Sequence, residues 1–163
     1  MISIEGKITR GRGLAKSTTI KEVDYLINAT QLQIMSGTVN LVTKNPISLR
    51  NENLELFYKY PNGRQKDFLP AILNGKIVYL TRWKNCPLHI FEIFSDEKIV
   101  GCNSDLGDDI CLFIDKKYVK STNIFAKLYW HAIWYRREAW WYQNNFYWRS
   151  FRLIFIKNVT GHS

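Results

Sequence analysis

Two oxygen-bearing side chains, Thr38 and Asn40, follow Gly37 within residues 36–41. Glycine permits a backbone turn that other residues resist. Alternate residues of an extended chain share one face, so the hydroxyl of Thr38 and the amide of Asn40 would point the same way. Such oxygens are hard ligands, which Mg²⁺ accepts together with substrate phosphates. The segment predicts either a magnesium site or, in the plainer interpretation, a turn followed by a half-buried strand.

Two further segments carry candidate chemistry. Residues 10–17 hold two glycines and three cations, so their amides and side chains can converge on phosphate, with a basic hairpin turn as the alternative. Glu92 interrupts an apolar strand over Ile90–Phe94 and would lie either on its solvent face or facing a site. In a site, the carboxylate would orient an acceptor hydroxyl or accept its proton.

Short strands separated by turn signals are expected to position these residues. Alternating apolar and polar residues predict a strand over Ile2–Thr9, and Thr19 with Glu22 forms a capping box that would begin a helix within residues 18–31. Asn74 followed by Gly75 predicts a hairpin. Further strands are expected at residues 54–60, 68–73, 77–82, 87–94 and 109–114. Many short strands with one helix predict a mainly β protein built as a barrel.

Length, charge and cysteine usage constrain the class of protein. The 163 residues suit one domain with an appendage, and no run of 18 apolar residues predicts a transmembrane helix. The three cysteines lack CxxC spacing, so they predict neither a zinc site nor a disulfide framework and suit a reducing cytosol. The net charge of +9 favours anionic partners, namely nucleotide, nucleic acid or anionic lipid.

The order of these segments resembles the CTP-dependent riboflavin kinases known mainly from archaea. A strand containing residues 4–8 runs into the glycine loop at residues 11–15, and a helix and the segment 37–41 follow. The strand Ile90–Phe94 and the turn at residues 106–108 precede the final strand. That family has a Gly-x-Gly-x-Gly/Ala loop, a Gly-Thr-Leu-Asn motif, a Glu-Ile-Ile-Ala-Pro strand end and an Asp-Gly-Asp turn. The resemblance covers about residues 2 to 114.

The resemblance implies a six-stranded cradle-loop barrel, Mg²⁺ held by Thr38 and Asn40, and Glu92 at the phosphoryl acceptor. It also implies that the nucleotide is contacted by Arg12, Gly13, Leu14, Ala15, Lys16, Ser17, Glu97, Lys98, Ile99 and Val100. Phosphoryl transfer consists mostly of positioning and of charge neutralisation by metal, amides and cations, so these implied roles agree with the residue types.

The residues that correspond to the family's acceptor-binding residues differ from the family pattern. Its Glu-Ile-Ile-Ala-Pro motif reads Glu-Ile-Phe-Ser-Asp at residues 92–96, without the proline. The family's threonine eight residues before the glutamate, which contacts the flavin, aligns with Lys84. A lysine among the acceptor-binding residues would suit an acceptor that carries a negative charge. The expected acceptor is therefore riboflavin or a different, anionic or membrane-associated molecule.

The C-terminal segment, residues 121–163, lies outside the family pattern and is expected to be an aromatic, basic extension of a barrel domain at residues 1–120. A helix is expected over residues 123–142, with Phe125, Leu128 and Ala132 on one stripe and Trp130 on a neighbouring one. Three interpretations stay open: the helix packs on the barrel, it lies at a membrane interface, or it binds nucleic acid.

Together these features predict a Mg²⁺-dependent kinase that transfers the γ-phosphate of CTP to a hydroxyl of a small molecule. The alternative is a non-catalytic binding module that uses the same barrel and applies its basic aromatic tail to nucleic acid or membrane. A cytoplasmic location is expected, with peripheral membrane association left open by the tail. No obligate protein partner is expected.

Overall fold

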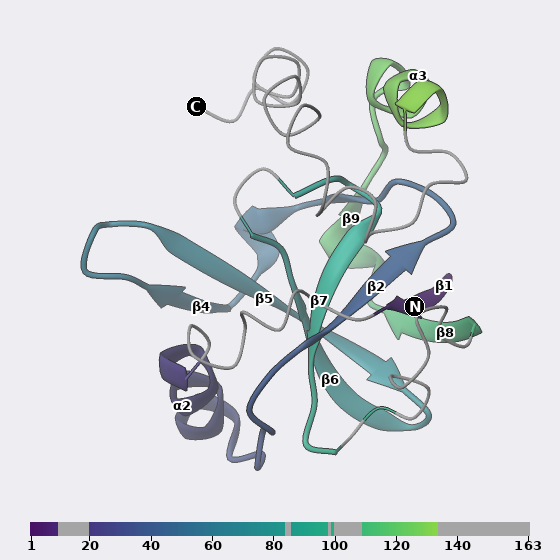
Figure 1. Ribbon diagram of the computed structural model, residues 1–163. Coiled ribbons are helices and arrows are strands. Elements are labelled where there is room, and N and C mark those ends of the chain that lie inside the picture. The colour runs from purple at the N-terminus through teal and green to yellow at the C-terminus, as the bar shows by residue number, and fades with distance from the viewer. Residues whose placement is uncertain (10–19, 84–85, 98, 100–108, 134–163) are drawn as a thin grey trace.

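Six antiparallel strands close into a barrel in this computed structural model, which describes residues 1–9, 20–83, 86–97, 99 and 109–133 (Figure 1). The neighbours around the barrel are β5, β6, β7, β2, β1 and β8, and the pairing of β8 with β5 closes it. These strands span Ile2–Thr9 (β1), Val39–Thr43 (β2), Gln65–Leu73 (β5), Lys76–Thr81 (β6), Ile90–Phe94 (β7) and Asp109–Ile114 (β8). The predicted six-stranded barrel is confirmed.

Smaller elements surround the barrel. Strand β4 pairs with β5 and extends that hairpin away from the barrel, with the helix α2 beside it, while the helix α3 lies at the far side of the molecule (Figure 1). The bounds are Ile20–Thr30 (α2), Ser48–Leu49 (β3), Asn51–Asn53 (η1), Leu56–Lys59 (β4), Lys116–Tyr118 (η2), Val119–Lys120 (β9) and Ile124–Ile133 (α3). Neither helix in the described ranges has the length and apolar content of a membrane span.

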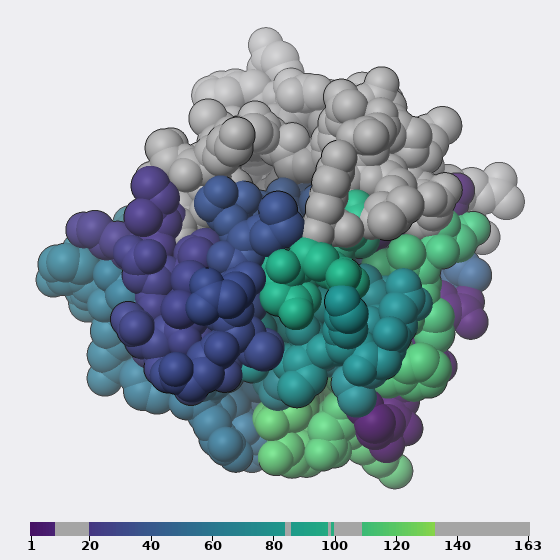
Figure 2. Space-filling model, turned by 90° about the horizontal axis from the view of Figure 1, so that it is seen from below, coloured from purple at the N-terminus to yellow at the C-terminus, as the bar shows by residue number. Residues whose placement is uncertain are grey.

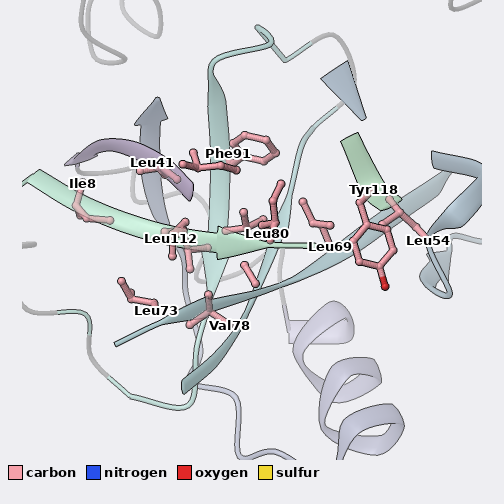
Figure 3. Packing of buried hydrophobic residues seen from close by; sticks show 14 residues of the cluster. Ile8, Leu41, Leu54, Leu69, Leu73, Val78, Leu80, Phe91, Leu112 and Tyr118 are labelled. Atoms are coloured by element: carbon pink, nitrogen blue, oxygen red, sulfur yellow. The ribbon is translucent and has the colours of Figure 1, made fainter. Parts of the chain in front are cut away.

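Alternation along the strands decides which side chains fill the barrel. The cross-strand pairs Leu41–Phe91 and Leu80–Ile93 point into the interior, where each side chain is at most 1% exposed. Figure 3 shows how inward side chains from β1, β2, β5, β6, β7 and β8 meet there. Because successive residues of a strand face opposite sides, the residues between them, such as Glu92, lie on the outer face of the barrel.

The outer face near the end of β7 is covered by α2. Val23 and Leu26 of this helix pack with Phe68, Tyr79 and Phe94 in a second apolar cluster. In the space-filling view, α2 and the segment that leads to β2 cover one side of the barrel (Figure 2). Strand β7 is therefore buried on both faces, and a carboxylate on its outer face is largely shielded from water.

Arg82, the residue after β6, stabilises the segment that leads into β7 by hydrogen bonds to backbone oxygens. Its guanidinium donates hydrogen bonds to the backbone oxygens of Ile47 at 2.9 Å and Ile90 at 3.0 Å, and a further one to that of Leu88. The guanidinium carbon lies 3.8 Å from the ring centroid of Phe91. Burial lowers the pKa of Arg82 to about 10, so the side chain stays charged at neutral pH.

Replacing Arg82 with methionine is expected to lower the free energy of unfolding by about 2 kcal/mol, because three carbonyl oxygens lose a charged donor. Urea denaturation would measure the change. Arg64→Met is the matched control, since Arg64 is exposed in the turn before β5, and it should change stability by less than about 0.5 kcal/mol. Equal stabilities of the two variants would show that the hydrogen bonds of Arg82 do not stabilise the fold.

Candidate functional site

Asn40 of β2 and Glu92 of β7 are directly paired across the two strands. Side chains of directly paired residues share one face, with Cβ atoms about 4.5–5.5 Å apart. Thr81 of β6 pairs with Glu92 from the other side, so the three residues form a polar row on the outer face of the barrel. Asn40 is 2% exposed and the Glu92 side chain 17%. Glu92 therefore does not lie on an open solvent face; its side chain is largely covered.

Thr38 lies beside the end of β7, because the next residue, Val39, pairs with Ile93. Gly37 has a φ of +102°, the turn conformation for which a glycine was expected. The amide of Met35 donates to the backbone oxygen of Ser95 at 2.8 Å, which joins the entry to β2 to the exit from β7. Thr9, the last residue of β1, pairs with Asn40. The chain therefore enters residues 10–17 next to Asn40, although those residues lie outside the described ranges.

Glu92 belongs to an ion-pair cluster that connects α2 with the barrel. The Lys66 Nζ atom lies 3.0 Å from Glu92 Oε2 and 3.2 Å from Glu22 Oε2. The Tyr60 hydroxyl donates a hydrogen bond to the other oxygen of Glu22. The side chains of Glu22 and Lys66 are only 3% and 12% exposed. A lysine between two buried carboxylates balances part of their charge, as buried ionic groups require.

Burial determines the protonation of Glu22. Desolvation raises the pKa of the Glu22 carboxyl, the Lys66 ammonium group opposes this, and the charge of Glu92 adds a smaller increase. With both carboxylates ionised, the cluster carries one negative charge in excess, next to the Asn40 amide. It is a place where a further cation would be stabilised by charge.

The sequence did not reveal this cluster. Glu22 matched a capping box, but in the structure its carboxylate is bound by Lys66 of β5 and by Tyr60 in the turn between β4 and β5. Lys66 lies in the polar stretch that opens β5, which carries no motif. Only the position of α2 over the β4–β5 hairpin brings the two residues together. A buried acid on the otherwise apolar face of α2, beside Val23 and Leu26, is the one signal that was available.

Of the residues predicted to contact the nucleotide, the structure describes Glu97 and Ile99. Glu97 follows the end of β7 and accepts a hydrogen bond from Lys76 at 2.5 Å on the surface. Ile99 packs against the barrel core. The remaining predicted contacts, and the acceptor residue Lys84, lie outside the described ranges: Arg12, Gly13, Leu14, Ala15, Lys16, Ser17, Lys98 and Val100.

The oxygen atoms available here could hold a hard cation such as Mg²⁺ only if a bound molecule supplies the remaining metal ligands. Across the described residues, no group of three or more His, Cys, Asp or Glu side chains is placed to hold a metal. In the same ranges the buried amide of Asn40 makes no hydrogen bond, so its oxygen is available as a ligand. Asn40 and Thr38 would supply two neutral oxygens, and Mg²⁺ commonly takes its other ligands from phosphates and water.

Comparison with known proteins does not assign the chain to a family. No protein-family model matches the chain, and no curated protein matches it. The function is therefore inferred from the residues of the site and from their arrangement.

Proposed function

We propose that the protein is a Mg²⁺-dependent phosphotransferase that transfers the γ-phosphate of CTP to a hydroxyl of a small molecule. The observation that supports the proposal best is the direct pairing of Asn40 with Glu92. A metal ligand and a carboxylate able to orient an acceptor hydroxyl then lie on neighbouring strands. Phosphoryl transfer needs mainly such positioning, together with neutralisation of phosphate charge.

Each residue has a separate role in this proposal. Thr38 and Asn40 would hold Mg²⁺, which would supply positive charge to the phosphate groups. Glu92 orients the acceptor hydroxyl or takes its proton. The glycine loop at residues 10–17 and the segment at residues 97–100 would surround the nucleotide, as in the family that the sequence resembles. CTP as donor and riboflavin as acceptor rest on that resemblance, whereas an anionic acceptor rests on Lys84, where the sequence differs from the family.

Lys66 is a positioning residue in the same proposal. It binds Oε2 of Glu92, whereas Oε1 receives no hydrogen bond from any described residue. The carboxylate is thereby held with one oxygen engaged and the other available to an acceptor hydroxyl.

A second candidate is a non-catalytic binding module that uses the same barrel. It is favoured by the concentration of basic residues in the C-terminal part of the chain, because residues 116–163 contain nine of the 23 Lys and Arg but one of the 14 acidic residues. Such a module would bind a polyanion with a strong dependence on salt and would have no requirement for Mg²⁺.

A thermal-unfolding screen of the four nucleoside triphosphates, each with Mg²⁺ or with EDTA, separates the two candidates. A ligand that binds only the folded state at about 100 times its dissociation constant stabilises it by about 2.7 kcal/mol. CTP with Mg²⁺ is expected to raise the unfolding temperature most, and EDTA should remove the shift. No shift, or equal shifts for all nucleotides that persist in EDTA, would contradict the phosphotransferase.

A further inference from the structure

One face of α3 presents apolar side chains to solvent. Ile124, Phe125 and Leu128 are 66%, 67% and 59% exposed. Residues three and four positions apart on a helix lie side by side, so Leu128 neighbours both Phe125 and Ile124. These three residues form one patch, called here the α3 patch. Single exposed apolar residues are common on proteins, but three large ones on one helical face indicate a contact surface.

The opposite face of α3 is anchored to the barrel, which fixes the direction of the patch. Ala126 and Trp130 are 7% and 6% exposed. The Trp130 ring lies 5.9 Å from the ring of His89, the residue before β7, in an edge-to-face arrangement. At the start of the helix, the Asn123 side chain accepts a hydrogen bond from the amide of Phe125 at 2.8 Å, which is an N-cap. The α3 patch therefore faces away from the barrel.

Basic residues accompany the patch. Lys127 lies three residues after Ile124 on the same helix and is exposed. Between residues 116 and 133 the chain has four lysines and no acidic residue. By contrast, residues 1–115 hold 14 basic and 13 acidic residues, so most of the net charge of +9 lies in the part of the chain that contains α3. Each Lys or Arg near an anionic bilayer contributes about 1 kcal/mol of attraction.

Aliphatic side chains in the patch distinguish a bilayer from nucleic acid as the partner. Isoleucine and leucine have no flat face on which a base can stack, whereas aromatic rings and guanidinium groups do. The boundary between lipid headgroups and acyl chains accepts apolar side chains of every shape, and it attracts basic residues beside them. Two of the three patch residues, Ile124 and Leu128, are therefore suited to lipid and unsuited to bases.

We propose that the α3 patch inserts into the interface of an anionic membrane, with Lys127 of the same helix on the lipid headgroups. The proposal is independent of the phosphotransferase, because α3 meets the barrel at His89, at the opposite end of the β2–β7 pair from Thr38.

Co-sedimentation of the full chain with sucrose-loaded vesicles tests the proposal. The vesicles contain phosphatidylcholine alone or phosphatidylcholine with phosphatidylglycerol, and a single-stranded RNA oligonucleotide serves as a competing polyanion. Leu128→Glu is expected to reduce binding to the anionic vesicles by about tenfold or more, since it places a charge in the inserted face. Ile77→Glu is the matched control: Ile77 is a 49% exposed aliphatic residue on β6, so this variant has the same net charge and should keep wild-type binding.

Each outcome decides the proposal. Binding that requires phosphatidylglycerol and is lost in Leu128→Glu but kept in Ile77→Glu supports it. Equal losses in the two variants would show attraction by charge alone and would overturn it. Absence of vesicle binding by the wild type would also overturn the proposal. So would displacement of the protein from vesicles by RNA, if Leu128→Glu binds the vesicles as tightly as the wild type. Circular dichroism of both variants checks that α3 and the barrel remain folded.

Discussion

Alanine in place of Asn40 is expected to weaken the joint binding of Mg²⁺ and CTP by about 100-fold or more, while the barrel stays folded. Loss of groups that merely orient metal ligands already costs about 10- to 100-fold in metal affinity, and Asn40 is proposed as a ligand itself. The fold should survive, because the Asn40 amide makes no hydrogen bond within the described ranges that the barrel would lose. Calorimetric titration of CTP in Mg²⁺ measures the affinity.

Asn28→Ala is the matched control for this prediction. Asn28 is exposed on α2, so the same amide is removed at a position away from the paired strands β2 and β7. Its affinity for Mg²⁺ and CTP should equal that of the wild type. Thermal unfolding without ligand shows whether Asn40→Ala is folded. If the folded variant binds Mg²⁺ and CTP as tightly as the wild type, Asn40 is not a metal ligand.

The sequence predicted the strands of the barrel well because each carries its own local signal. Residues that alternate between the core and the other face specify β1 and β8 to the residue, over Ile2–Thr9 and Asp109–Ile114. The hairpin between β5 and β6 follows from Asn74 and Gly75, which have φ values of +52° and +79°. The two-residue strands β3 and β9 were not predicted, since so short a segment has no periodicity.

The arrangement of the site was less predictable because it depends on strand order. Asn40 and Glu92 were each candidates, yet their direct pairing follows only from the register of β2 against β7. The partnership of Lys66 with Glu22 requires the tertiary position of α2. For α3, the sequence placed Phe125 and Leu128 on one stripe and Trp130 on a neighbouring one, without indicating which stripe packs on the barrel. The structure packs the stripe of Trp130 on the barrel and leaves Phe125 and Leu128 exposed.

Lys66→Met is expected to lower the free energy of unfolding by about 3 kcal/mol at neutral pH. The variant removes the cation from between Glu22 and Glu92 and leaves two poorly solvated carboxylates facing each other. Lys76→Met is the matched control, because Lys76 pairs with Glu97 at 2.5 Å but is 52% exposed, and surface ion pairs contribute about 0–1 kcal/mol. Urea denaturation of both variants measures the difference.

The same variant should show a characteristic dependence on pH. Burial raises the pKa of Glu22 above its ordinary value of 4.5, so its contribution to stability is complete below that value and is lost as the pH rises through the higher pKa of the folded state. Lys66 opposes this rise in pKa, and its removal therefore enlarges the loss. The difference in stability between Lys66→Met and the wild type should shrink as the pH falls towards 4.5, where Glu22 becomes neutral in both. A difference that is constant with pH, or no larger than that of Lys76→Met, would show that Lys66 does not hold the two carboxylates together.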